Sequence, residues 1–222
     1  MKIFMAFSIL FLCFSLYSQQ KPAVAEAKKL DPVQAVKYLE KKEQELEKWT
    51  KVAAEKGSDL LTKKNNAMSE ILNNIMDYDF IARFTIGLSF ETASEAKKKE
   101  LFNKLRELVT EFYLEEIFYN KGYEKKYIER GLEKMYIKGV DQSIAITTEI
   151  QVFIKKKPVV YEVVYHLYMP EKIKEYRVFD IELDGVSLIR NYKTQFQKTI
   201  KDGGVDELIK KIDKKIKTKN TK

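Results

Sequence analysis

The sequence predicts an α+β fold in which helices come first and an antiparallel sheet follows. Apolar residues recur at helical spacing up to about Tyr119, whereas beyond Gly122 they recur at every second position. The segments with period two follow one another through short turns, which is typical of an antiparallel meander and not of a parallel sheet with helical crossovers. We therefore expect a sheet of about four strands, packed with N-terminal and C-terminal helices.

Residues 1–18 are typical of a secretory signal peptide. Lys2 precedes an apolar segment from Ile3 to Leu16, and polar residues follow from Ser18. A membrane anchor is the alternative, but the segment is shorter than the roughly 20 residues that span a bilayer. The only cysteine, Cys13, lies inside this segment, so a chain cleaved after Ser18 has neither disulfides nor cysteine metal sites.

The rest of the chain predicts one domain with short extensions. Residues 19–30 are small and charged without an apolar period, which indicates a flexible leader. Residues 31–217 suffice for one domain with a sizeable core, and residues 218–222 form a basic tail. The formal net charge of +8 favours anionic partners, from lipid headgroups to nucleic acid. Acids are interleaved with the lysines, however, so we expect a solvated surface and no nucleic-acid site.

The N-terminal helices are marked by caps and breakers. Asp31-Pro32 is typical of a helix start, and the apolar spacing that follows stops at Gly57. We expect a second helix over residues 59–76 and a shorter one over residues 80–87. The clearest helical spacing covers residues 94–119, where one broad apolar face is expected to be buried.

The sheet and the closing helices are predicted from the change of period. Residues 159–169 are apolar or aromatic on both sides, as expected for a central strand covered on both faces. Two closing helices are expected over residues 187–201 and 205–217, separated by Gly203-Gly204. The expected strands cover residues 129–138, 143–154, 159–169 and 175–183.

Residues 176–204 carry the most specific motif of the chain. It consists of an alternating strand, a glycine turn, a serine that can cap a helix and an amphipathic helix, with Asp180, Gly185, Ser187, Tyr192 and Phe196 at its key positions. This string resembles the closing motif of the MlaC family, the toluene-tolerance proteins of the Gram-negative periplasm. Residues 79–87 and 101–113 resemble two weaker motifs of the same family, in the same order. Lys193 departs from the motif, because arginine is usual there.

The resemblance implies an NTF2-like, cystatin-like fold. Such a fold has a strongly curved antiparallel sheet, helices across its concave side and a deep apolar pocket for acyl chains, with the phosphate headgroup near solvent. On this resemblance we expect Asp180, Gly185, Ser187, Tyr192 and Phe196 to be structural. The residues expected to form the pocket wall or its backing are Phe80, Phe84, Phe102, Leu105, Val109, Phe112, Ile150, Val152, Val163 and Tyr165. Each of these, taken singly, also fits ordinary core.

The resemblance further implies a soluble periplasmic phospholipid carrier and not an enzyme. Such a carrier shuttles lipid between an outer-membrane lipoprotein complex and an inner-membrane ABC transporter with its substrate-binding subunit, and so maintains outer-membrane lipid asymmetry. Phospholipid is then the cargo and no other cofactor is expected. We expect a monomer that comes near membranes only transiently.

Two other classes of function remain open on sequence alone. An NTF2-like enzyme acting on a small apolar substrate needs acid–base groups, and Asp180, Glu182 and Asp184 share one strand face that can bind a metal or move protons. His166 is the only histidine and lacks cysteine partners, so we expect no metal site. Ser187 lacks the Gly-x-Ser-x-Gly context of a nucleophile and is expected to cap a helix. A structural or adhesin-like interaction protein is the third class.

Overall fold

The computed structural model describes residues 30–55, 57–112, 125–137, 140–154 and 157–220. For β1 and both ends of β2 it describes the backbone alone. The helices are α1 (Pro32–Thr50), α2 (Asp59–Ile75), α3 (Tyr78–Ile86), α4 (Leu88–Glu91), α5 (Glu95–Phe112) and α6 (Leu188–Asn220). The strands are β1 (Lys125–Ile137), β2 (Val140–Ile154), β3 (Lys157–Tyr168), β4 (Arg177–Leu183) and β5 (Val186–Ser187).

This element order confirms the predicted α+β class. The strands form one antiparallel sheet in the order β1-β2-β3-β4-β5, so that every strand pairs with its neighbour in the chain. Four of the strands were expected, and the two-residue β5 adds a short fifth. The prediction also missed α4, a single turn that follows Gly87, where a φ of 68° separates it from α3.

Short polar side chains start the first three helices. The Asp31 carboxylate accepts hydrogen bonds from the backbone N–H groups of Val33 and Gln34, at 3.0 and 3.3 Å, and Pro32 occupies the first helical position. Ser58 accepts from the N–H of Leu61 at 3.1 Å, and Asp77 accepts from the N–H of Phe80 at 2.9 Å. These caps satisfy N–H groups that have no partner inside the helix.

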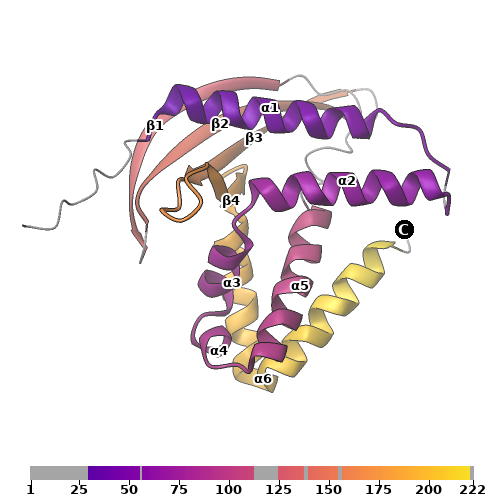
Figure 1. Cartoon of the computed structure of the whole chain (residues 1–222), viewed down its shortest axis with the longest axis vertical. Helices are drawn as coiled ribbons and strands as arrows, with labels where there is room; N and C mark the ends of the chain where they lie inside the picture. The colour runs from indigo at the N-terminus through magenta and orange to yellow at the C-terminus, as the bar shows by residue number, and fades with distance from the viewer. Residues whose placement is uncertain (1–29, 56, 113–124, 138–139, 155–156, 221–222) are drawn as a thin grey trace, which may run out of the picture.

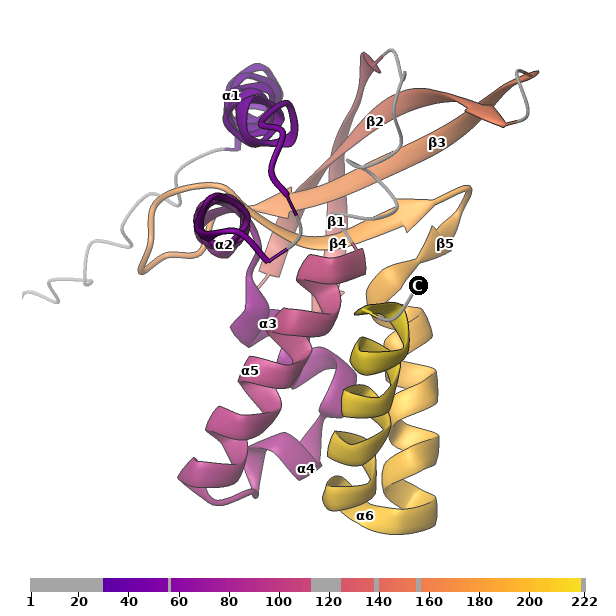
Figure 2. The same cartoon turned by 90° about the vertical axis from the view of Figure 1, so that its right-hand side faces the viewer.

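The helices lie on different sides of the sheet. Figure 2 shows α1 end-on at one side of the strands, while α3, α5 and α6 stand below them as a separate bundle. α1 extends over the sheet and contacts β1 and β2 (Figure 1). α3 and α6 contact β4, so the bundle joins the sheet at its last long strand.

α6 consists of two arms that run back along each other. Gly204 has a φ of 76° and a ψ of −175°, which breaks the helix at the predicted glycine pair. The second arm returns beside α5 (Figure 2) and is joined to it by two ion pairs, Lys97 with Asp206 at 2.6 Å and Lys104 with Asp213 at 2.7 Å. The bend therefore completes a bundle of α3, α5 and both arms of α6.

The two faces of the sheet differ in chemistry, because successive residues of a strand point to opposite sides. We call the side under α1 the α1 face; in β2 and β3 it carries Ile144, Ile146, Thr148, Ile150, Val163, Tyr165 and Leu167, and in β4 it carries Ile181. We call the opposite side the polar face; it carries Ala145, Thr147, Val164, His166, Asp180 and Glu182. A register shift after His166 makes Phe179 the extra residue of a bulge in β4.

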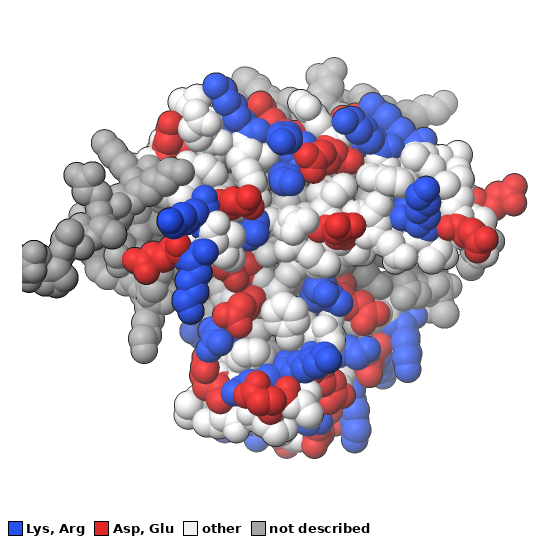
Figure 3. Space-filling model, in the orientation of Figure 1, with Lys and Arg blue, Asp and Glu red and all other residues white. Residues whose placement is uncertain are grey.

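Charges on the surface are mixed in sign. Figure 3 shows lysine and arginine side chains interspersed with acids over α1, α2 and the bundle, as the sequence indicated. Among the described residues, no helix combines the length and the apolar character needed to span a bilayer.

Candidate functional site

Asp180 connects the end of β4 to the start of α6. Its Oδ1 accepts hydrogen bonds from the backbone N–H groups of Ile181 at 2.8 Å and Ile189 at 3.1 Å. Its Oδ2 accepts a hydrogen bond from the Ser187 hydroxyl at 2.5 Å. The Ser187 oxygen in turn accepts a hydrogen bond from the backbone N–H of Arg190 at 3.1 Å. Ser187 is thus a helix cap held by Asp180, and the pair positions the first turn of α6.

The turn before this cap requires unusual backbone angles. Asp184 and Gly185 both have positive φ, 48° and 77°, as in the tight turns that join hairpin strands. Glycine adopts such angles without strain, which accounts for Gly185 at this position. The turn brings Ser187 back beside Glu182 in the sheet, close enough to reach Asp180.

Asp180 is a buried carboxyl with only 4% of its surface exposed. Burial raises the pKa of Asp180, because a charge is poorly solvated away from water. The hydrogen bonds from Ser187 and Ile189, and the charge of His166, act against this rise. The ionised form of the Asp180 carboxyl is therefore stabilised by hydrogen-bond donors of the protein in place of water.

His166 and Glu182 lie next to Asp180 on the polar face. His166 is opposite Asp180 across the β3–β4 ladder, and its Nε2 is 3.1 Å from Glu182 Oε1. Ligand atoms of all three side chains lie within 4.8 Å of one another. Asp184, which the sequence grouped with Asp180 and Glu182, does not join them, because it lies in the turn and its Oδ1 accepts the N–H of Glu162 at 3.0 Å.

Tyr192 and Phe196 fasten the first arm of α6. Their rings stack at 5.2 Å with an interplanar angle of 11°, and both are almost fully buried. Burial raises the pKa of Tyr192, and the Lys215 ammonium of the second arm lies 5.0 Å from its ring centre. Lys193 lies with its Nζ 4.4 Å above the ring of Phe84, so this lysine contacts α3 by a cation–π interaction.

The described members of the set expected to line an apolar pocket belong to one continuous core or pack against it. Ile150, Val163 and Tyr165 belong to the α1 face and are buried. Leu105 and Val109 are fully buried in α5. Phe80, Phe84 and Phe102 are only partly buried and pack at the edge of the core. The side chains of Phe112 and Val152 lie outside the described residues.

The partly buried rings make aromatic contacts within the bundle and, through Phe80, with the sheet. Phe80 stacks on Phe84 at 6.0 Å and meets the bulge residue Phe179 edge-on at 5.2 Å. Phe102 of α5 meets Tyr78 of α3 at 6.3 Å. Among the described members of the expected set, Phe80, Phe84 and Phe102 are the side chains that retain contact with solvent.

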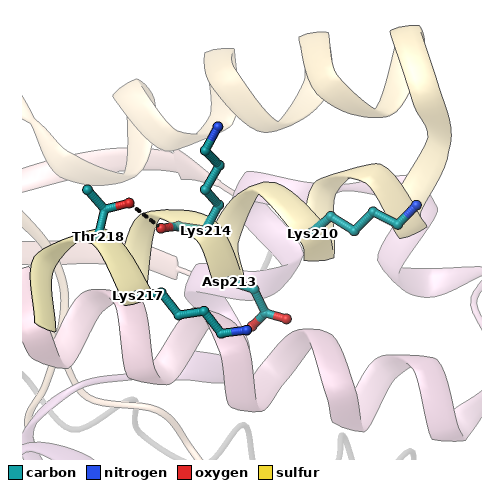
Figure 4. A pocket seen from close by; sticks show the side chains of 5 residues that line it. All are labelled: Lys210, Asp213, Lys214, Lys217 and Thr218. Carbon is teal, nitrogen blue, oxygen red and sulfur yellow. Dashed lines mark hydrogen bonds between the residues drawn. The ribbon is translucent and has the colours of Figure 1, made fainter. Parts of the chain in front are cut away.

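Two hollows that described residues line are open to solvent and are lined mainly by residues with charged or polar ends. One, of about 510 Å³, lies along the second arm of α6 and is lined by Lys210, Asp213, Lys214, Lys217 and Thr218 (Figure 4). The other, of about 440 Å³, lies between α1 and α2 with Trp49 at its edge. None of the expected pocket residues lines either hollow.

A buried polar pair under α1 was not predicted from the sequence. Tyr165, a residue of the α1 face, donates its hydroxyl to Glu43 Oε1 of α1 at 3.0 Å, and both side chains are buried. The signal was present, because Leu39, Glu43 and Leu46 are spaced as one helical stripe and a carboxylate interrupts it. The contact between Tyr165 and Glu43 shows that a hydrogen bond, as well as apolar packing, orients α1 on the sheet.

Comparisons with known proteins agree with this architecture. A phospholipid-binding protein from Ralstonia solanacearum, solved in complex with a phospholipid, has a similar structure, with a TM-score of 0.58 and 15% sequence identity. The similarity covers 81% of this chain and 95% of that chain, and at this identity it concerns the fold. No curated protein matches the chain. The sequence model of the MlaC protein matches residues 42–214, which is well over half of the chain, and the chain therefore belongs to the MlaC family.

Proposed function

We propose that this protein binds phospholipid and carries it through the periplasm. Membership of the MlaC family is the observation that carries the proposal. The likeness in fold to a protein solved with a bound phospholipid supports it. In this proposal the acyl chains lie in the apolar layer between the sheet and the helices, and the headgroup stays near solvent.

The energetics of the apolar core favour such a cargo. Burying one methylene group stabilises a complex by about 0.8 kcal/mol, so two acyl chains provide a large gross driving force. Much of this is offset by ordering of the lipid and by imperfect fit. The half-buried rings Phe80, Phe84 and Phe102 are the side chains that a chain entering the layer would meet first, since the remaining described members of the expected set are almost fully buried.

The finer parts of the proposal concern export and partners. Residues 1–18 direct the chain to the periplasm and are removed there. The carrier then accepts and delivers lipid at an outer-membrane lipoprotein complex and at an inner-membrane ABC transporter with its substrate-binding subunit, which maintains outer-membrane lipid asymmetry. It acts as a monomer without a catalytic cofactor.

Native mass spectrometry of protein purified without detergent tests the proposal, together with extraction and identification of bound lipid. We expect about one phospholipid per chain and a lower melting temperature after the lipid is stripped, because a ligand stabilises the state that binds it. Phe84→Ser should reduce the lipid content, since it removes a half-buried ring that stacks on Phe80. Leu60→Ser is the matched control, because Leu60 is an exposed apolar residue of α2.

A lipid-free protein that takes up no phospholipid from vesicles would overturn the proposal. The alternative of an NTF2-like enzyme would then be the next to test, with His166, Asp180 and Glu182 as its acid–base groups. Equal loss of lipid in the Phe84 and Leu60 variants would place the cargo elsewhere in the molecule.

A further inference from the structure

His166, Asp180 and Glu182 form a group whose chemistry a lipid carrier does not use. The three side chains belong to adjacent strands of the polar face, because His166 pairs with Asp180 across the ladder and Glu182 is two residues further along β4. From their geometry we propose that they bind a divalent transition-metal ion, with Zn²⁺ as the preferred metal. This inference does not depend on phospholipid binding.

The distances fit a shared metal. Zinc binds imidazole nitrogen and carboxylate oxygen at about 2.0–2.2 Å, so two ligands of one tetrahedral zinc are separated by roughly 3.3 Å. His166 Nε2 and Glu182 Oε1 are 3.1 Å apart, and an oxygen of Asp180 completes a group within 4.8 Å. A modest approach of Asp180 is enough to place all three around one ion.

Asp180 is held in the manner of a metal ligand. Its Oδ1 accepts two backbone N–H groups and its Oδ2 accepts one hydroxyl proton, from Ser187. An ionised carboxylate oxygen offers two acceptor directions, so Oδ2 has one left for a cation. Hydrogen bonds of this kind fix the orientation of ligating carboxylates and raise the affinity of metal sites.

Thr147 supplies a second and independent observation. It lies on the polar face, diagonally across the β2–β3 ladder from His166, and only 2% of its surface is exposed. Within the described part of the chain its hydroxyl has no hydrogen-bond partner, although a buried hydroxyl normally has one. Water in the fourth coordination position of the metal would satisfy this hydroxyl.

The ligand set and its exposure indicate the class of metal. One imidazole and two carboxylates suit zinc and neighbouring first-row ions better than Ca²⁺ or Mg²⁺, which prefer sets made only of oxygen. The side chains of His166 and Glu182 are 12% and 23% exposed, which leaves a path for the ion from solvent. The bound ion would tie β3 and β4 to the first turn of α6.

Zinc titration of the full chain tests the proposal, in protein purified with EDTA and without a polyhistidine tag. Because His166 is the only histidine, long-range ¹H–¹⁵N spectra of its imidazole report on this one side chain. We expect one Zn²⁺ per chain, a large shift of the Nε2 resonance and a higher melting temperature. Glu182→Gln should weaken binding at least tenfold. Asp184→Asn is the matched control, because Asp184 lies in the turn directly after β4, outside the group, and its substitution should leave the affinity unchanged.

Three results would overturn the proposal. Zinc uptake that leaves the imidazole resonances unchanged, or equal affinity in wild type, His166→Gln and Glu182→Gln, would place the ion elsewhere in the molecule. No zinc uptake by the wild type would mean that these side chains form hydrogen bonds and an ion pair only. Spectra of each apo variant show whether it is folded, so a loss of binding through unfolding is recognised.

Discussion

Strands β2, β3 and β4 present an apolar surface on the side of α1 and a polar surface on the opposite side. On the α1 face, Ile144, Ile146 and Ile150 of β2 and their partners in β3 pack beneath α1. The polar face places His166, Asp180 and Glu182 within reach of one another and of α6. The α1 face therefore contributes apolar packing, whereas the polar face contributes fixed polar contacts that position α6.

Leu39→Ala should have the largest effect, because it opens a cavity over the α1 face. Leu39 is fully buried in α1, and truncation of such a side chain costs about 2–5 kcal/mol of unfolding free energy. Urea denaturation measures the loss. Leu60→Ala, at an exposed position of α2, is the control and should change stability by less than about 0.5 kcal/mol. Similar values for both variants would mean that α1 contributes little to the core.

Asp180→Ala should have the second largest effect and lower the free energy of unfolding by about 2–4 kcal/mol. The change leaves two buried N–H groups and a hydroxyl without their acceptor. Asp180→Asn keeps Oδ1 as an acceptor, so its free energy of unfolding should fall clearly less than that of Asp180→Ala. Chemical denaturation in EDTA compares the two variants. If they were equally destabilised, hydrogen bonding at the start of α6 would not be the role of Asp180.

Tyr165→Phe tests the hydrogen bond between the α1 face and α1. The change keeps the ring and removes the hydroxyl that donates to the buried Glu43 carboxylate, so we expect a loss of about 1–3 kcal/mol. Thermal and urea unfolding give the value. Tyr161→Phe, on the same strand and face, is the control with a partly buried ring. Equal effects in both variants would argue against a specific Glu43 contact.

Thr148→Val and Thr147→Val compare the faces at two neighbouring positions. Both hydroxyls are buried without a hydrogen-bond partner among the described residues, and removing such a group should raise stability by about 1 kcal/mol. We expect this gain for Thr148 on the α1 face with or without zinc. For Thr147 the gain should disappear when zinc is present, because valine cannot bond to metal-bound water. Unfolding curves with EDTA and with Zn²⁺ separate the two positions.

Sequence patterns predicted most elements of the fold. The change from helical to two-residue spacing of apolar side chains beyond Gly122 predicted the antiparallel meander. Asp31-Pro32 predicted the start of α1. The glycine pair at 203–204 marked the bend of α6. These predictions succeeded because period, capping and glycine conformation act over a few residues and are independent of the rest of the chain. α4 was missed because a single turn has no period to detect.

The sequence by itself determined the α+β class, the order of helices and strands and the family to which the chain belongs. Only the tertiary structure decided which polar side chains meet. It paired Tyr165 with Glu43 over 122 positions of sequence, turned Asp184 away from Asp180 and brought His166 to Glu182. Alternation along a strand assigns a residue to a face, but strand register, the bulge at Phe179 and the placement of α1 decide its neighbours.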